Sequence, residues 1–133
     1  WALLGTVKGL RKSNDLAGAV RMIALMGAES VLVNGIIKSF FRRTRPPWEV
    51  ERPLRVRRPL TSSFPSGHAT SATSAAIILS KDDELWPLYV AIAAVVATSR
   101  IYVKIHHASD VAGGVALGVV LGIIGRRLLP APH

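Results

Sequence analysis

Long apolar blocks separated by short charged segments are the feature that most restricts how this chain can fold. The blocks cover residues 16–37, 68–80, 85–103 and 109–129. A helix needs roughly 20 apolar residues to cross a bilayer, so the first, third and fourth blocks are long enough. The second is shorter and rich in Ala, Ser and Thr, which favours a helix buried among other helices. We therefore predict an all-α integral-membrane helical bundle of about four spans, preceded by a partial helix near the N-terminus.

The distribution of charge supports a membrane protein rather than a nucleic-acid-binding protein. The chain carries a formal charge of +9, which in a soluble domain would suggest a nucleic acid partner. Here the basic residues lie between the apolar blocks, as in the loops of membrane proteins. We therefore expect a multi-pass protein of the cell membrane, with the bilayer as partner and no nucleic acid. The absence of cysteine excludes disulfides and thiolate nucleophiles.

The connections between the blocks also carry local signals. Asn14 and Asp15 are suited to cap the first helix, and residues 81–84 predict a tight polar turn. Prolines prevent a helix from continuing through residues 42–64, which we predict to be the one long loop. The last block carries glycines at four-residue spacing, which predicts a stripe where another helix approaches closely. These are Gly114, Gly118 and Gly122.

Four spans would place residues 38–67 and 104–110 on the same face of the membrane. Three cations are expected to converge there, and unpaired charge at a membrane edge is costly unless it serves an anion. The planar fork of arginine suits phosphate in particular. The three cations are Lys38, Arg45 and Arg100.

The start of the second helix adds to the same anion site. Ser66 and Gly67 directly precede the apolar block, so their backbone N–H groups and the positive end of the helix would face the anion. The sequence therefore predicts a phosphate-sized anion site at this face.

Two histidines bring reactivity to this face. His106 and Asp110 are four residues apart and would share a helical face if a helix begins near His106. A carboxylate on one ring nitrogen fixes the tautomer and leaves the other nitrogen free to attack. His107 has Val111 at the same offset, so His106 is the predicted nucleophile. His68, at the start of the second helix, is predicted to protonate a leaving oxygen and then to activate water.

These residues form three motifs, K-x6-R-P, P-S-G-H and S-R-x5-H-x3-D, between Lys38 and Asp110. The set resembles the signature of the type 2 phosphatidic acid phosphatase superfamily, which also includes vanadium haloperoxidases. The resemblance implies one membrane phosphatase domain over residues 1–133, with the family's N-terminal helices missing or truncated. It also implies that five residues bind the phosphoryl group and three are catalytic. The five are Lys38, Arg45, Ser66, Gly67 and Arg100, and the three are His106, His68 and Asp110.

The resemblance implies hydrolysis of a lipid-linked phosphomonoester or pyrophosphate through a phosphohistidine, with no metal and no cofactor. Isoprenoid phosphates, phosphatidic acid and similar lipids are candidate substrates. The abundance of Ala, Val and Arg resembles actinobacterial members of the family, which adds decaprenylphosphoryl phosphoribose to the candidates. Two alternatives belong to other classes: a vanadate-dependent haloperoxidase-like oxidoreductase, and a non-catalytic membrane protein that binds anionic lipid through its arginines.

Overall fold

The computed structural model describes residues 16–47, 60–81 and 83–128, and its regular elements within them are all helical. Helix α2 (Leu16–Val31) continues through a π-helical turn, η1 (Leu32–Ile36), and a 3₁₀ turn, η2 (Ile37–Phe40). The later helices are α3 (Gly67–Leu79), α4 (Trp86–Tyr102) and α5 (Ala108–Leu128). The four predicted helices are thus confirmed, with small differences at their ends.

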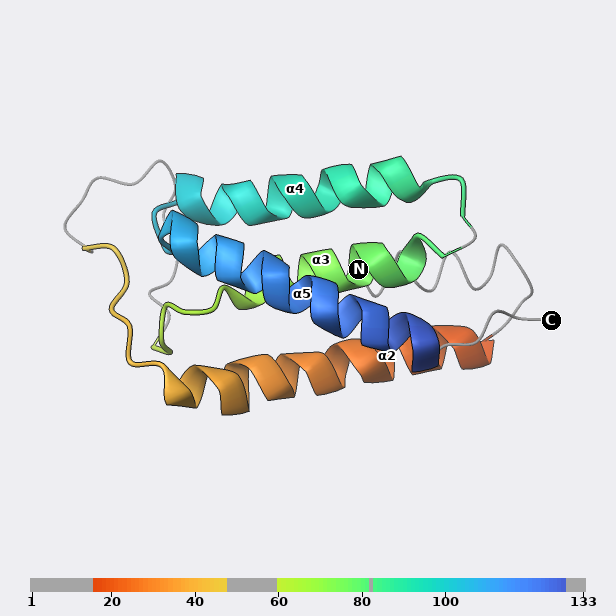
Figure 1. Cartoon of the computed structure of the whole chain (residues 1–133), viewed down its shortest axis with the longest axis horizontal. Helices are drawn as coiled ribbons and strands as arrows, with labels where there is room; N and C mark the ends of the chain where they lie inside the picture. The colour runs from red at the N-terminus through yellow and green to blue at the C-terminus, as the bar shows by residue number, and fades with distance from the viewer. Residues whose placement is uncertain (1–15, 48–59, 82, 129–133) are drawn as a thin grey trace.

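Helix α3 lies at the centre of the bundle. Figure 1 shows α2 and α4 on opposite sides with α3 between them, and α3 packs most extensively against α5 and then α4. Most of its buried residues are small or weakly polar, including Ala69, Ala72 and Ala75 on one side and Thr70 and Ser74 on another. The prediction that this short helix is packed inside the bundle is confirmed.

The glycine stripe of α5 sets its distance from α3. Gly114, Gly118 and Gly122 are all buried. A Cβ atom would lie 2.6 Å from the carbonyl oxygen of Ser66 if placed on Gly114, and 2.6 Å from that of Thr70 if placed on Gly118. Because these neighbours are backbone atoms, only glycine permits this approach. The predicted close-approach stripe is confirmed, and it holds the start of α5 against the start of α3.

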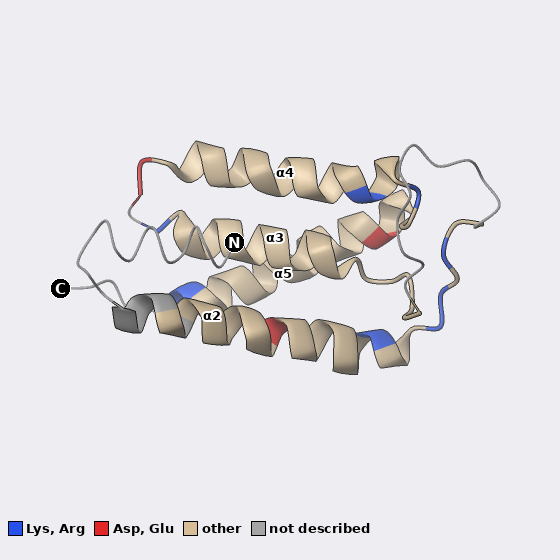
Figure 2. Cartoon of the chain, turned by 180° about the vertical axis from the view of Figure 1, so that it is seen from behind, with Lys and Arg blue, Asp and Glu red and all other residues tan. Residues whose placement is uncertain are grey.

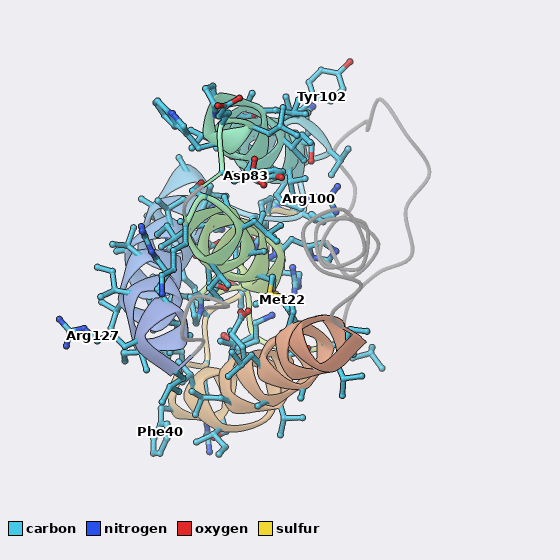
Figure 3. The ribbon with its side chains drawn as sticks, turned by 90° about the vertical axis from the view of Figure 1, so that its right-hand side faces the viewer. Met22, Phe40, Asp83, Arg100, Tyr102 and Arg127 are labelled. Atoms are coloured by element: carbon cyan, nitrogen blue, oxygen red, sulfur yellow. The ribbon has the colours of Figure 1, made fainter. Side chains whose placement is uncertain are left out.

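The outer surface of the bundle is largely apolar. Two helical stretches, Met22–Phe40 and Ala108–Leu128, are long and apolar enough to cross a membrane, whereas α4 is a shorter apolar helix of 17 residues. Length alone therefore supports two of the roughly four expected spans. Figure 2 shows the charged positions gathered at the two ends of the bundle, apart from one acidic position within α2. In Figure 3, Phe40 and Tyr102 project outward, whereas Met22 points toward α3.

The predicted connections are described in part. The polar turn before α4 is present, with Asp83 Oδ1 accepting a hydrogen bond of 2.9 Å from the Leu85 N–H. Residues 41–47 and 60–66 are non-helical, as predicted for the long loop. The partial helix at residues 1–10 and the capping role of Asn14 and Asp15 lie outside the described residues.

Candidate active site

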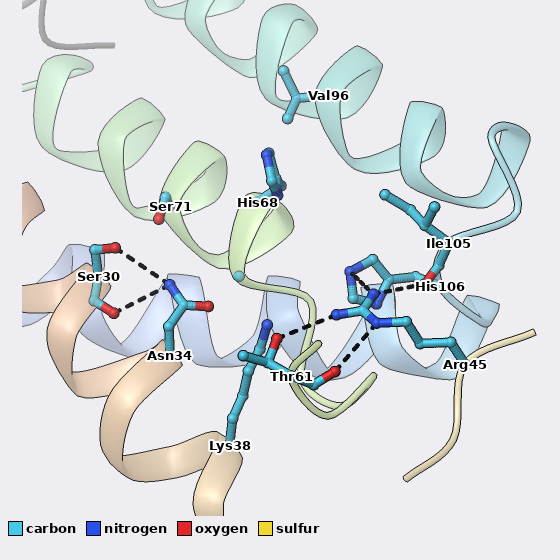
Figure 4. Close-up of a pocket in the computed structure, with 11 residues that line it drawn as sticks. Ser30, Asn34, Lys38, Arg45, Thr61, His68, Ser71, Val96, Ile105 and His106 are labelled. Atoms are coloured by element: carbon cyan, nitrogen blue, oxygen red, sulfur yellow. Dashed lines mark hydrogen bonds between the residues drawn. The ribbon is translucent and has the colours of Figure 1, made fainter. Parts of the chain in front are cut away.

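A cavity of about 480 Å³ lies where α2 ends and α3 begins. Figure 4 shows the side chains that converge on it. Residues from separate parts of the chain line it: Ser30, Asn34, Lys38, Arg45, Thr61, Gly67, His68, Ser71, Val96, Ile105 and His106. The structure therefore brings together five of the eight predicted site residues, namely Lys38, Arg45, Gly67, His68 and His106.

His106 lies in the short connection before α5 rather than on the helix. Because α5 begins at Ala108, the expected shared helical face with Asp110 is not formed. Lys104 adopts a left-handed conformation with φ of 54°, and the N–H groups of Ile105 and His106 both reach the carbonyl oxygen of Arg100 at 3.3 Å. This turn at the end of α4 leaves the His106 side chain buried beside the cavity.

Asp110 is fully buried and lies close to His106, but the two side chains are not hydrogen-bonded. Its Oδ2 atom lies 3.7 Å from His106 Nδ1, which is longer than a hydrogen bond. The same oxygen accepts hydrogen bonds from the Ser63 hydroxyl and, at 2.8 Å, from the His107 N–H. Arg43 Nη1 lies 3.0 Å from Oδ1. The carboxylate thus joins the residue directly after His106 to Ser63 and Arg43 in the loop before α3.

Arg45 fastens the loop before α3 to the segment that carries His106. Its Nη1 atom donates to the carbonyl oxygen of Ile105 at 2.8 Å and lies 3.3 Å from His106 Nε2. Its Nε and Nη2 atoms donate to the carbonyl oxygens of Thr61 and Ser62, both at 3.2 Å. Since a guanidinium only donates, the His106 Nε2 atom accepts this hydrogen bond, which places the ring proton on Nδ1.

The surroundings of His106 favour its uncharged form. Burial first, and then the positive charges of Arg45 and Lys38, lower the pKa of His106 to about 4, although Asp110 opposes this effect. Burial also lowers the pKa of Arg45. At neutral pH the His106 ring is therefore uncharged and carries a lone pair on Nε2, as a nucleophile requires.

The other predicted phosphate ligands lie around the cavity without lining it. The N–H of Ser66 donates to the carbonyl oxygen of Asp110 at 2.9 Å, so it is not directed at the cavity. The Ser66 hydroxyl is buried and has no hydrogen-bond partner among the described residues. Arg100 Nε donates to the Ser99 hydroxyl at 3.0 Å, and Arg100 lies close enough to His68 for its charge to act on the imidazole.

Sequence reasoning missed several residues that build this site. Arg43 and Ser63 contact Asp110, and Thr61 accepts hydrogen bonds from Arg45. They lie in a loop with several arginines, serines and threonines, where spacing does not distinguish a structural residue from a solvated one. Ser30 and Asn34 could have been noticed, because with Lys38 they repeat every four residues along an otherwise apolar helix.

The chain is thus a helical bundle with a cavity lined by two histidines, a lysine and an arginine, among other residues. Residues 18–132 match the PAP2 superfamily, and the chain belongs to that family. Among the described residues, no group of three or more His, Asp or Glu side chains is arranged to hold a metal ion.

The chain is similar to decaprenylphosphoryl-5-phosphoribose phosphatase from two strains of Mycobacterium tuberculosis, with 39% identity over 125 residues. The protein of the same name from Mycolicibacterium smegmatis is 36% identical over 79 residues, or 59% of this chain and 43% of that protein. The fold is similar to the crystal structure of a transmembrane PAP2-type phosphatidylglycerolphosphate phosphatase from Bacillus subtilis. That match has a TM-score of 0.72 and 23% identity, and covers 95% of this chain.

The chain spans only part of these relatives. It covers 66% of the length of the Mycobacterium tuberculosis proteins and 65% of the Bacillus subtilis chain, whereas the first alignment takes in 92% of this chain.

Proposed function

We propose that this chain is a multi-pass membrane phosphatase that hydrolyses a lipid-linked phosphomonoester through a phosphohistidine at His106. The observation that carries the proposal is the position of His106, whose Nε2 atom lies beside a cavity that Lys38, Arg45 and His68 also line. Burial and the neighbouring cations favour the uncharged form of His106. Two fixed cations match the charge of a phosphoryl group, and a neutral imidazole beside them is a suitable nucleophile.

The first chemical step transfers the phosphoryl group to the enzyme. The lone pair of His106 Nε2 forms a bond to phosphorus, and the bond from phosphorus to the ester oxygen breaks. His68, which binds a proton when the negatively charged phosphoryl group lies beside it, gives that proton to the ester oxygen, so the alcohol leaves uncharged. Lys38 and Arg45 hold the phosphoryl oxygens, on which charge accumulates in phosphoryl transfer. Arg45 must exchange its hydrogen bond to His106 for one to the phosphoryl group before the attack.

The second step returns the enzyme to its starting state. Water gives a proton to His68, and its oxygen forms a bond to phosphorus. The nitrogen–phosphorus electron pair returns to His106, and inorganic phosphate leaves. Asp110 acts in both steps as a buried negative charge that stabilises the positively charged phosphohistidine. Arg100 and Ser66 are proposed to approach the phosphoryl group only when it is bound.

A location in the cell membrane is supported by the apolar outer faces of α4 and α5. Large apolar side chains such as Val95 and Val120 are more than half exposed, a pattern that is unfavourable in water over a contiguous surface. A substrate embedded in the bilayer could then reach the cavity from the membrane. Because the relatives are named for a decaprenylphosphoryl phosphoribose, we propose a polyprenyl-linked sugar phosphate as the substrate.

The test is phosphate release from a panel of lipid phosphates by the purified chain in detergent or bilayer discs. We expect release from at least one lipid phosphomonoester, and loss of that release in His106→Ala. A well-folded protein with no phosphatase activity on any lipid phosphate would contradict the proposal. Halide oxidation in the presence of vanadate would instead support the haloperoxidase alternative.

A further inference from the structure

One side of the cavity is lined by uncharged polar side chains that the phosphoryl chemistry does not use. Ser30 and Asn34 of the first helical segment and Ser71 of α3 line the cavity together with the cationic residues. Figure 4 shows Ser30 and Asn34 on the opposite side of Lys38 from Arg45 and His106. The cavity, at about 480 Å³, is much larger than a phosphoryl group. Its polar side therefore has room for a second part of the substrate.

Hydrogen bonds within this polar side determine which donors and acceptors remain available to a ligand. Asn34 Nδ2 donates to both the carbonyl oxygen and the hydroxyl of Ser30, at 3.1 and 3.2 Å. Because the carbonyl oxygen only accepts, the amide nitrogen is assigned to that side, and Asn34 Oδ1 remains an acceptor. The Ser30 hydroxyl accepts this bond and keeps its own proton for a ligand. This pair thus offers one acceptor and one donor.

Glu29 fixes the hydroxyl of Ser71. The carboxyl group of Glu29 is buried within the first apolar helix and accepts hydrogen bonds of 2.9 Å from Ser71 and from Ser74. With its proton committed to Glu29 Oε1, Ser71 Oγ presents only lone pairs to the cavity. An ionisable side chain at this depth of a helix that could span a membrane is costly and commonly has a function.

We propose that Ser30, Asn34 and Ser71, with Glu29 as a positioning residue, form a subsite for a hydroxyl-bearing leaving group, such as a sugar or a glycerol headgroup. This inference rests on the proposed phosphatase function. Two of the three groups are acceptors, which pair with hydroxyl donors and repel the oxygens of a second phosphate. Ser71 lies one helical turn beyond His68, the residue that protonates the leaving oxygen. The leaving group would therefore extend from His68 toward this subsite.

The test compares two phosphomonoesters of similar size that differ in hydroxyl groups, and adds a larger lipid diphosphate that lacks them. The probes are ribose 5-phosphate, n-pentyl phosphate and farnesyl diphosphate, each measured as kcat/KM with the full chain. We expect ribose 5-phosphate to exceed the other two by about tenfold or more, since a site built to bind hydroxyls discriminates strongly against analogues that lack them. Equal rates for ribose 5-phosphate and pentyl phosphate would overturn the subsite while leaving the phosphatase function intact. Failure of the chain to hydrolyse any phosphomonoester, lipid substrates included, would instead overturn the phosphatase function.

Variants test whether the preference for ribose 5-phosphate over pentyl phosphate depends on the subsite residues. Ser71→Ala should lower the ratio of kcat/KM for ribose 5-phosphate over pentyl phosphate by about three- to tenfold, the value of one hydrogen bond. Ser74→Ala is the matched control, because it removes an equivalent bond to Glu29 from a residue that does not line the cavity. Ser30→Ala, at an exposed position, should lower the ratio without a packing defect. If Ser71→Ala and Ser30→Ala leave the ratio unchanged, the subsite is wrong.

Discussion

Arg45 combines the task predicted from the sequence with a second task that only the structure reveals. It is a predicted phosphate ligand, and it also joins Thr61 and Ser62 to the segment that contains Ile105 and His106. Only a planar guanidinium has donors in enough directions to do both, because the lysine ammonium acts as a single point charge. Its replacement should therefore affect the position of the nucleophile as well as the affinity for phosphate.

We predict that Arg45→Lys lowers kcat/KM by at least about 100-fold although it conserves charge, a loss comparable to removing one preorganised donor in other enzymes. Arg42→Lys is the matched control, since Arg42 lies in the same loop, is exposed and does not line the cavity. Phosphate release under matched folding conditions measures both variants. Equal effects of the two substitutions would contradict the assignment of Arg45 to the site and of Arg42 to the exposed surface of the loop.

A second prediction at the level of single residues concerns the protonation of His106. Burial, Arg45 and Lys38 lower its pKa to about 4, from an ordinary value near 6.5. The ring should therefore stay uncharged when the pH is lowered from 7 to 5. Diethyl pyrocarbonate reacts only with unprotonated imidazole. We therefore expect its rate of reaction with His106, followed by peptide mass spectrometry, to stay nearly constant over this range. N-acetylhistidine as the control should lose most of its reactivity, and a matching loss at His106 would contradict the account.

The same shift has a consequence for folding. In the unfolded chain His106 would bind a proton as the pH falls through its ordinary pKa, whereas in the folded chain it does so only near pH 4. As the pH falls from about 6.5 to 4, this group therefore progressively lowers the free energy of unfolding. Above that range it has no such effect.

Among the contacts between helices, the one between α3 and α5 determines how the residues around the site are positioned. Asp110 lies in the first turn of α5, and its carbonyl oxygen accepts a hydrogen bond from the Ser66 N–H at the start of α3. The close approach of the glycine stripe keeps these two helix starts together, so packing along the bundle is coupled to the geometry around His106.

We predict that Gly118→Ala destabilises the protein by about 1–3 kcal/mol, as overpacking of a close helix contact does. The added Cβ would lie 2.6 Å from a backbone oxygen of Thr70 and 2.8 Å from the Thr73 Cβ. Gly27→Ala is the control, because nothing lies within 4 Å of its added Cβ and alanine favours a helix. Thermal unfolding in detergent should show a lower Tm for the first variant only. An unchanged Tm for Gly118→Ala would contradict the described packing.

The helices could be predicted from the sequence because apolar blocks, prolines and glycine spacing act locally. The convergence of Lys38, Arg45, His68 and His106 on one cavity was also predictable, from the alternation of loops across a membrane. The partners of Asp110 were not, since Arg43 and Ser63 reach it only through the fold of the loop. The place of His106 outside α5 depends on the left-handed turn at Lys104, and a lysine gives no sequence signal for that conformation.

For the whole molecule, the proposed mechanism gives fixed cations and a neutral imidazole the roles that metal ions have in many other phosphatases. We therefore predict that turnover of a lipid phosphomonoester by the full chain continues at an undiminished rate in excess EDTA. The control is the same assay after magnesium is added back, which should change nothing. Loss of activity in EDTA that magnesium restores would contradict the proposed roles of Lys38 and Arg45.

The central claim is the covalent phosphohistidine at His106, and trapping it is the most direct measurement. In His68→Ala, attack on p-nitrophenyl phosphate should survive, because this leaving group needs little protonation, whereas water activation is impaired. A short pulse, an alkaline quench and peptide mass spectrometry should therefore find phosphate on His106. His106→Ala should accumulate none, and His107→Ala should keep substantial turnover. Phosphate on His107, or a dead His107 variant beside an active His106 variant, would contradict the account.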